Sequence, residues 1–142
     1  MPVRNAEAQW EGKLHDGHGV MKLGSGAFKG RYSFSSRFEM GPGTNPEELI
    51  GAAHAGCFSM ALASILEKAG HPPERIHTSA KVHIDRADEG FRITVIELAT
   101  EGKVPGITEG EFRTHAETAK VNCPVSKALV GTDIRLEAKL IP

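Results

Sequence analysis

Hydrophobic and polar residues alternate along the first part of the chain, which is the pattern of strands that bury one face. Residues 5–11 alternate first, and residues 20–23 follow after a turn that contains glycine and histidine. Residues 28–39 alternate more regularly, and the aromatic side chains all fall on one side: Phe28, Tyr32, Phe34 and Phe38. The pattern predicts three strands, the third ending at the Gly-Pro-Gly sequence at 41–43.

A long helix is predicted next. Asn45 and Pro46 have the residue types of an N-cap and a first helical position, and Glu48 stands where a capping box places an acidic side chain. The helix should continue to about Ala69, where Gly70 and two prolines stop it. A helix of about 24 residues is roughly 36 Å long, enough to cross a small domain. Its many small side chains would let a neighbouring element approach closely, so we expect a central helix.

The remaining pattern predicts a hairpin, two helices and a last strand. Residues 78–86 alternate, a turn follows, and residues 91–100 return as a more apolar strand. Thr108 and Glu111 form a second capping-box sequence that opens a helix to about Val121, and a short helix restarts at Pro124. Residues 134–140 alternate again. Strands followed by helices in this order predict an α+β fold with largely antiparallel pairing, rather than repeated βαβ units.

Length and charge narrow the class of protein. A chain of 142 residues fits a single domain spanning residues 1–142. Because 17 basic residues nearly balance 18 acidic ones, and no basic cluster forms a stripe, nucleic acid is excluded as a partner. The N-terminus lacks the apolar core of a signal peptide, and no apolar run approaches the ~18 residues of a membrane span. We therefore expect a soluble cytoplasmic protein with no membrane partner.

The chain has two cysteines, Cys57 and Cys123, which are too few and too distant for a disulfide framework. Cys57, in a helix of small residues, could be a packed small hydrophobe. Cys123 precedes Pro124 at a helix N-cap, which either favours a thiolate or is an ordinary helix junction. His54, one turn before Cys57, could be a base or a packed histidine. The seven histidines show no paired ligand spacing, so no metal site is expected.

Two motifs resemble those of a known family. The sequences TNPEELIGAAHAGCFSMAL, at 44–62, and CPVSKAL, at 123–129, resemble the cysteine motifs of the OsmC/Ohr family of thiol-dependent hydroperoxide reductases, and more closely those of the OsmC branch. The resemblance extends over nearly the whole chain, including SFSSRFE, DEGFRITVIEL and VPGI. It implies an OsmC-like α+β fold, in which antiparallel sheets wrap around long central helices in an intertwined homodimer, and it implies no cofactor.

The resemblance also implies the roles of four residues. Cys57 matches the cysteine that attacks the peroxide, and Cys123 matches the one that resolves the product. Arg37 and Glu47 match the family's arginine ahead of the helix and its glutamate after Asn-Pro. Arg37 would favour the thiolate while Glu47 orients the guanidinium bidentately. On pattern alone, Arg37 could be a charge on the polar face of a strand, and Glu47 could simply favour the helix N-terminus.

These roles predict a two-cysteine peroxidase. A sulfenic acid on Cys57 would condense with Cys123 to a disulfide. The family implies organic hydroperoxides as better substrates than hydrogen peroxide, and a dithiol reductant such as a lipoylated protein. Ten residues of helix, about 15 Å, separate Glu47 from Cys57, so we expect active sites shared across the homodimer. The alternatives are a redox-sensing or small-ligand-binding module with the same cysteine pair, and a structural dimer with inert thiols.

Overall fold

The computed structural model describes the whole chain, Met1–Pro142. The chain divides into two compact units, Met1–Leu49 and Ile50–Pro142. Two compact units can belong to one domain, so the arrangement as a single domain stays a prediction.

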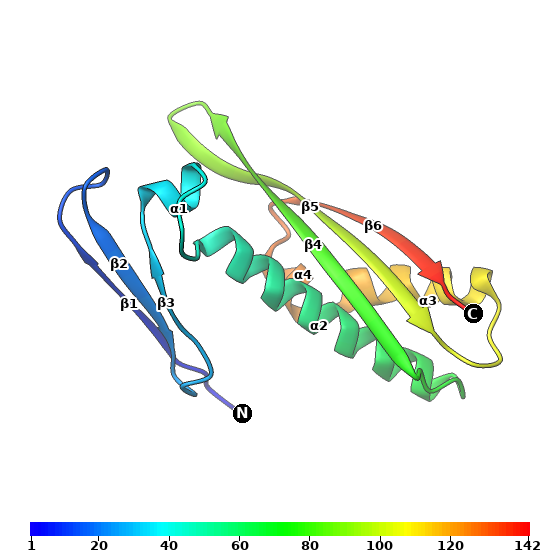
Figure 1. The fold of residues 1–142 in the computed structure, drawn as a ribbon. Helices are drawn as coiled ribbons and strands as arrows, with labels where there is room; N and C mark the ends of the chain where they lie inside the picture. Colours follow the sequence, from blue (N-terminus) through cyan, green and yellow to red (C-terminus); the bar gives the residue numbers. More distant parts are fainter. The chain divides into compact units, whose positions relative to one another are not determined.

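The first unit contains a three-stranded antiparallel sheet (Figure 1). Its strands are β1 (Ala6–Glu11), β2 (His18–Leu23) and β3 (Lys29–Tyr32), in the order β1-β2-β3. Trp10 of β1 packs against Tyr32 of β3, with ring centroids 5.4 Å apart. Gly19 of β2 lies beneath the Tyr32 ring, where a Cβ atom would overlap the ring. The alternating pattern therefore predicted the first two strands correctly, and a glycine allows the aromatic pair to close over the sheet.

The third predicted strand, 28–39, is wrong in its second half. β3 ends at Tyr32, and a short helix, α1 (Phe34–Phe38), follows. Ser33 is its N-cap: the Ser33 hydroxyl accepts from the Ser36 backbone N–H, and the Ser36 hydroxyl accepts from the Ser33 N–H. Phe34 and Phe38 lie one helical turn apart, and their rings pack at 5.1 Å. A spacing of four fits a strand face and a helix face equally well, so alternation alone could not distinguish them.

The long helix, α2 (Pro46–Lys68), begins as predicted. The Asn45 Oδ1 accepts a hydrogen bond of 2.8 Å from the Glu48 backbone N–H, which is N-cap geometry. The Glu48 carboxylate does not close a capping box and instead accepts a hydrogen bond of 2.6 Å from the Thr44 hydroxyl. After Lys68 the chain turns through Gly70 with φ +84°, the left-handed conformation expected of a C-terminal glycine.

The second unit, which contains most of α2, also contains a three-stranded sheet with the order β4-β5-β6. Its remaining elements are β4 (Arg75–Ala87), β5 (Gly90–Lys103), α3 (Glu109–Asn122), α4 (Pro124–Ala128) and β6 (Asp133–Leu140). The predicted hairpin is β4 and β5, and the Thr108 N-cap of α3 is confirmed. β6 pairs parallel to β5, because α3 and α4 carry the chain back along the sheet before β6 starts. The expectation of antiparallel pairing fails for this one pair.

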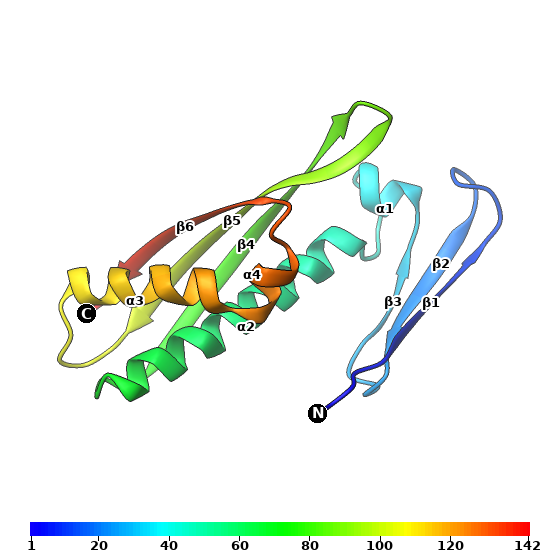
Figure 2. The ribbon, with the colours of Figure 1, turned by 180° about the vertical axis from the view of Figure 1, so that it is seen from behind.

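The core of the second unit lies between one face of this sheet and the helices α2 and α3 (Figure 2). Both helices and β5 contribute buried side chains to one cluster: Phe58, Leu62, Leu66, Ile96, Leu98, Phe112, Ala116 and Ala119. Exposure alternates along most of β4 and along β6, as the alternation of residues 78–86 and 134–140 predicts. This packing fixes α3 against α2, so the end of α3 is held near the middle of α2.

Contrary to expectation, α2 is long and apolar enough, by length and composition, to cross a membrane. The mean hydropathy of its most apolar 18-residue window is 1.7. One such helix is weak evidence of a membrane span, because the core helix of a soluble protein meets the same criteria.

Candidate active site

The fold brings the two cysteines together. The Cys123 Sγ lies 2.8 Å from the Cys57 Sγ, across 66 residues of chain, and the Cys123 thiol donates to the Cys57 sulfur. Both residues are free cysteines. Cys57 is partly exposed, whereas Cys123 has no exposed surface. The pair therefore has one sulfur that a dissolved reagent can reach and a second sulfur directly behind it.

Cys123 is held at the junction of two helices. Its backbone N–H donates to the Ala119 carbonyl at 2.9 Å, which ends α3, and Pro124 begins α4. The predicted N-cap position of Cys123 is thus confirmed. Its thiol makes no capping hydrogen bond and is directed to Cys57 instead. The junction serves to aim the Cys123 sulfur at α2.

The surroundings of Cys57 keep its thiol protonated. Burial raises the pKa of the Cys57 thiol, and the hydrogen bond with Cys123 raises it further. A hydrogen bond with the Val125 backbone N–H, in the first turn of α4, lowers the pKa but does not offset the other two effects. Because the thiolate is the nucleophile, Cys57 needs a nearby positive charge to react at neutral pH.

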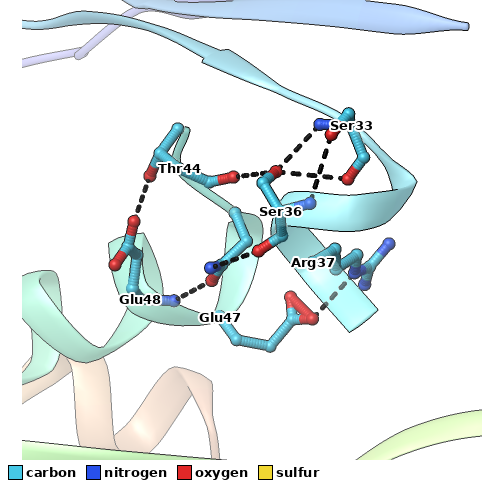
Figure 3. Close-up of polar contacts among 7 residues, drawn as sticks. Ser33, Ser36, Arg37, Thr44, Glu47 and Glu48 are labelled. Carbon is cyan, nitrogen blue, oxygen red and sulfur yellow. Dashed lines mark hydrogen bonds and ion pairs between the residues drawn. The ribbon is translucent and has the colours of Figure 1, made fainter. Parts of the chain in front are cut away.

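Arg37 and Glu47 form the second part of the predicted site, in the first unit (Figure 3). The Arg37 Nε donates a hydrogen bond of 2.7 Å to the Glu47 Oε1. The Glu47 side chain is 8% exposed and the Arg37 side chain 37% exposed. The pair is joined by this single bond, so the bidentate geometry expected from the sequence is not observed. The guanidinium thus keeps both terminal nitrogens for another acceptor, and the Glu47 Oε2 is buried without a hydrogen-bond partner.

The connection between α1 and α2 fixes these two side chains (Figure 3). The Ser36 hydroxyl donates to the Thr44 carbonyl at 2.6 Å, and the Asn45 amide donates to the Ser36 carbonyl at 3.2 Å. Ser36 directly precedes Arg37, and Asn45 begins the helix that carries Glu47. Ser36 is a residue that the sequence interpretation missed. The signal that could have found it is the Ser-x-x-Ser spacing from Ser33, since a serine pair can form a reciprocal cap.

A second buried pair lies beside the cysteines. The His54 Nε2 is 2.7 Å from the Ser126 Oγ, and this bond joins α2 to α4. His54 has no exposed surface, and Ser126 is 5% exposed. Burial lowers the pKa of His54, so its ring is neutral at neutral pH. Of the two interpretations of His54, the packed histidine agrees with this burial. The sequence interpretation gave no role to Ser126.

None of these residues forms a metal cluster: the chain has no group of three or more His, Cys, Asp or Glu side chains arranged to hold a metal ion. The reactive groups among the predicted site residues are two thiols, a guanidinium and a carboxylate.

Comparisons with known proteins agree with this chemistry. Residues 39–139 match the family model described as OsmC-like protein. The chain belongs to the OsmC family. Within the OsmC family, peroxiredoxin OsmC of Escherichia coli (strain K12) is 48% identical over 138 residues, which is 96% of each chain. The organic hydroperoxide resistance protein of Xanthomonas axonopodis pv. citri (strain 306) is 37% identical over 93 residues, 64% of this chain and 63% of that protein.

The fold agrees as well. The crystal structure of the organic hydroperoxide resistance protein OhrB of Bacillus subtilis superimposes with a TM-score of 0.76 at 24% identity, covering 95% of this chain and 98% of that one. The predicted α+β fold of the OsmC type and the predicted likeness to its OsmC branch are confirmed.

Proposed function

We propose that this protein is a thiol-dependent hydroperoxide reductase in which Cys57 attacks the peroxide and Cys123 resolves the product. The observation that carries the proposal is the Cys57–Cys123 contact at 2.8 Å, with only Cys57 accessible from solvent. The relatives named peroxiredoxin OsmC and organic hydroperoxide resistance protein support the same class of reaction. Because Cys123 is buried, it is suited to meet the oxidised Cys57 rather than the dissolved peroxide.

The reaction balances with these two thiols. The Cys57 thiolate attacks the terminal oxygen of ROOH, the O–O bond breaks, and a proton completes the alcohol ROH while Cys57 becomes a sulfenic acid. The Cys123 thiol then displaces the hydroxyl from that sulfur, which forms the disulfide and releases water. A disulfide bond is about 2.0 Å long, so two sulfurs at 2.8 Å need little movement to reach bonding distance.

Arg37 and Glu47 complete the proposed site. Burial raises the pKa of Cys57, so a guanidinium that binds the thiolate or the peroxide oxygen supplies the missing activation. The free terminal nitrogens of Arg37 suit this role, and the buried Glu47 holds the guanidinium through its Nε. No cofactor is needed for this chemistry.

The substrates are proposed from the same relatives. Organic hydroperoxides are expected to react faster than hydrogen peroxide, in keeping with the name of the Xanthomonas relative. The disulfide must be reduced by two electrons in each cycle, and a dithiol can deliver both through thiol–disulfide exchange. A lipoylated protein carries such a dithiol and is the reductant we propose, in the cytoplasm.

A homodimer with shared active sites is also proposed. Glu47 and Cys57 are ten positions apart on α2, which corresponds to about 15 Å along a helix. Two antiparallel α2 helices related by a two-fold axis would bring Glu47 of one subunit toward Cys57 of the other.

Mixed dimers of Glu47→Gln and Cys57→Ser chains test this arrangement. If the sites are shared, the mixed dimer has one site with both residues intact, and mixing restores activity to inactive parents. If Glu47 serves Cys57 of its own chain, no intact site forms and mixing restores nothing.

The proposed function is tested by single-turnover mixing of the reduced protein with cumene hydroperoxide or hydrogen peroxide, followed by thiol counting and peptide mapping. We expect rapid loss of both thiols, one Cys57–Cys123 disulfide per chain, and no reaction in Cys57→Ser. In Cys123→Ser, Cys57 should still be oxidised, but as sulfenic and then sulfinic acid. Slow oxidation that does not turn over with a dithiol would overturn the peroxidase and favour a redox-sensing module.

A further inference from the structure

The bond between His54 and Ser126 parallels the contact between the cysteines. His54 lies three residues before Cys57 on α2, and Ser126 lies three residues after Cys123. Residues three apart lie on the same side of a helix. The segment Cys123–Ser126 is thus joined to α2 by a sulfur–sulfur contact of 2.8 Å, by the Val125 backbone N–H to Cys57, and by a nitrogen–oxygen hydrogen bond of 2.7 Å between His54 and Ser126. The His54–Ser126 bond is buried, so water competes little for it.

The element that needs this link is α4. It has five residues, Pro124–Ala128, and a helix this short does not hold its own conformation in water. Its N-cap, Cys123, makes no side-chain capping hydrogen bond. The position of α4 therefore depends on its bonds to the rest of the chain, and the Ser126 hydroxyl makes the side-chain hydrogen bond to the central helix.

We propose that the His54–Ser126 hydrogen bond positions Cys123 for attack on the oxidised Cys57. His54 and Ser126 are positioning residues on this account, since neither reacts with the peroxide. The inference rests on the proposed function, because it concerns the second step of that reaction. On this proposal, the His54–Ser126 bond makes the Cys57 sulfenic acid react with Cys123 to form the disulfide.

The position of Cys123 matters because the Cys57 sulfenic acid can react in two ways. In the first, the Cys123 sulfur attacks the Cys57 sulfur, the S–O bond breaks, and water leaves with the Cys123 proton. In the second, another hydroperoxide molecule transfers an oxygen to the Cys57 sulfur, which gives a sulfinic acid and the alcohol. The first is unimolecular and the second depends on peroxide concentration. If α4 is held less firmly, disulfide formation slows while oxidation by hydroperoxide does not, so sulfinic acid accumulates.

The test compares Ser126→Ala and Ser126→Thr with the wild-type chain. Each reduced protein is mixed with increasing cumene hydroperoxide, and the disulfide and sulfinic forms of Cys57 are counted by intact mass and peptide mapping. We expect disulfide formation in Ser126→Ala to slow by about tenfold, the effect of losing one buried hydrogen bond, with sulfinic acid appearing at a correspondingly lower peroxide dose. Ser126→Thr keeps the hydroxyl and should restore the wild-type ratio. Formation of the sulfenic acid should keep its wild-type rate.

Ser59→Ala is the matched control. The Ser59 hydroxyl donates to the Thr78 hydroxyl at 2.8 Å, so this variant also loses a side-chain hydrogen bond from α2, but one that leads to β4 rather than α4. It should keep the wild-type ratio of disulfide to sulfinic acid. If Ser126→Ala acted only by lowering stability, Ser59→Ala should shift this ratio as well. Melting temperatures of all variants measure the loss of stability.

His54→Phe provides an independent variant, since it keeps a ring of similar size and removes the nitrogen. It should give the same ratio as Ser126→Ala, and the double variant should be no worse than either single one, because all three lack the same bond. Folded variants that form disulfide at the wild-type rate would overturn the positioning role. A wild-type chain that forms no disulfide would instead overturn the proposed function.

Discussion

Arg37 binds Glu47 through its Nε alone, which leaves the two terminal nitrogens of the guanidinium for the role that we propose for Arg37. The Cys57 thiol is protonated at rest, since burial raises its pKa, so we expect Arg37 to set the rate of the first step. Arg37→Ala should lower the second-order rate constant for cumene hydroperoxide by about 100-fold, because a charged donor to the developing thiolate is lost. Arg37→Lys keeps the charge without the fork and should lower it by about tenfold. Stopped-flow measurement of peroxide consumption gives these rate constants.

Arg31 provides the control for the charge of Arg37. It lies on β3 in the same unit and is exposed. Arg31→Ala should leave the rate constant unchanged. Equal losses in Arg31→Ala and Arg37→Ala would mean that the net charge attracts the substrate, and would remove the specific role of Arg37.

His54 makes stability depend on pH in a defined direction. Burial is the only cause of its lowered pKa, so no neighbouring charge offsets the shift. In the unfolded chain the ring takes up a proton near its ordinary pKa of 6.5, while in the folded chain it stays neutral to a lower pH. The stabilisation is therefore complete above pH 6.5 and is lost as the pH falls from there toward the folded pKa. Free energies of unfolding at about pH 7.5 and pH 5.5 measure the loss.

His54→Gln should lose less stability than the wild-type chain between the two pH values. His77→Gln changes an exposed histidine and should keep the full loss. If His54→Gln and the wild-type chain lose the same free energy, the buried ring is not the group that titrates.

Among the elements, β5 and α3 meet where Gly102 faces the ring of Phe112. A Cβ atom at Gly102 would overlap that ring, so Gly102→Ala must displace a fully buried side chain. We expect a loss of about 1–3 kcal/mol in the free energy of unfolding. Gly110→Ala adds its methyl to α3 in open space and should change stability by no more than about 1 kcal/mol, in the stabilising direction. Denaturant titration of both variants checks the sign of each change.

The elements also show what the sequence could and could not predict. The long helix was predicted to within a residue or two, because Asn45, Pro46 and Gly70 mark its ends chemically. α1 was missed, since Phe34 and Phe38 fit both periodicities and only the Ser33 cap separates them. The parallel pairing of β6 was missed because alternation shows which face of a strand is buried but not which way its neighbour runs.

The candidate site, too, was predicted only in part. The types of its residues came from short motifs, whereas nothing in the sequence between Cys57 and Cys123, which are 66 positions apart, indicated their contact. That contact depends on α3 packing beside α2 through Phe58, Phe112 and their neighbours, which only the fold supplies. The bond between His54 and Ser126 lay within the same two motifs and escaped notice, because each residue alone has an ordinary structural explanation.

For the whole molecule, α2 is more apolar than its burial within one chain explains. Its most apolar 18-residue window has a mean hydropathy of 1.7, yet only 28% of that window is buried. One side of the helix packs into the core through Phe58, Leu62 and Leu66. Another side presents small and apolar residues to solvent: Ala52, Ala53, Gly56 and Met60. A second copy of α2 is the occupant we propose for this side, in keeping with the proposed homodimer.

Met60 tests that assembly directly. Its side chain is 77% exposed in the single chain, and a charge placed in a helix–helix contact must be desolvated without a partner. Met60→Lys should therefore raise the dissociation constant of the dimer by at least about tenfold. Static light scattering and analytical ultracentrifugation across a dilution series measure this constant. Met40→Lys, at a residue that is 99% exposed and lies outside α2, is the matched control and should leave the dissociation constant unchanged. A wild-type chain that remains monomeric at high concentration would contradict the dimer, and with it the sharing of Glu47 and Cys57 between subunits.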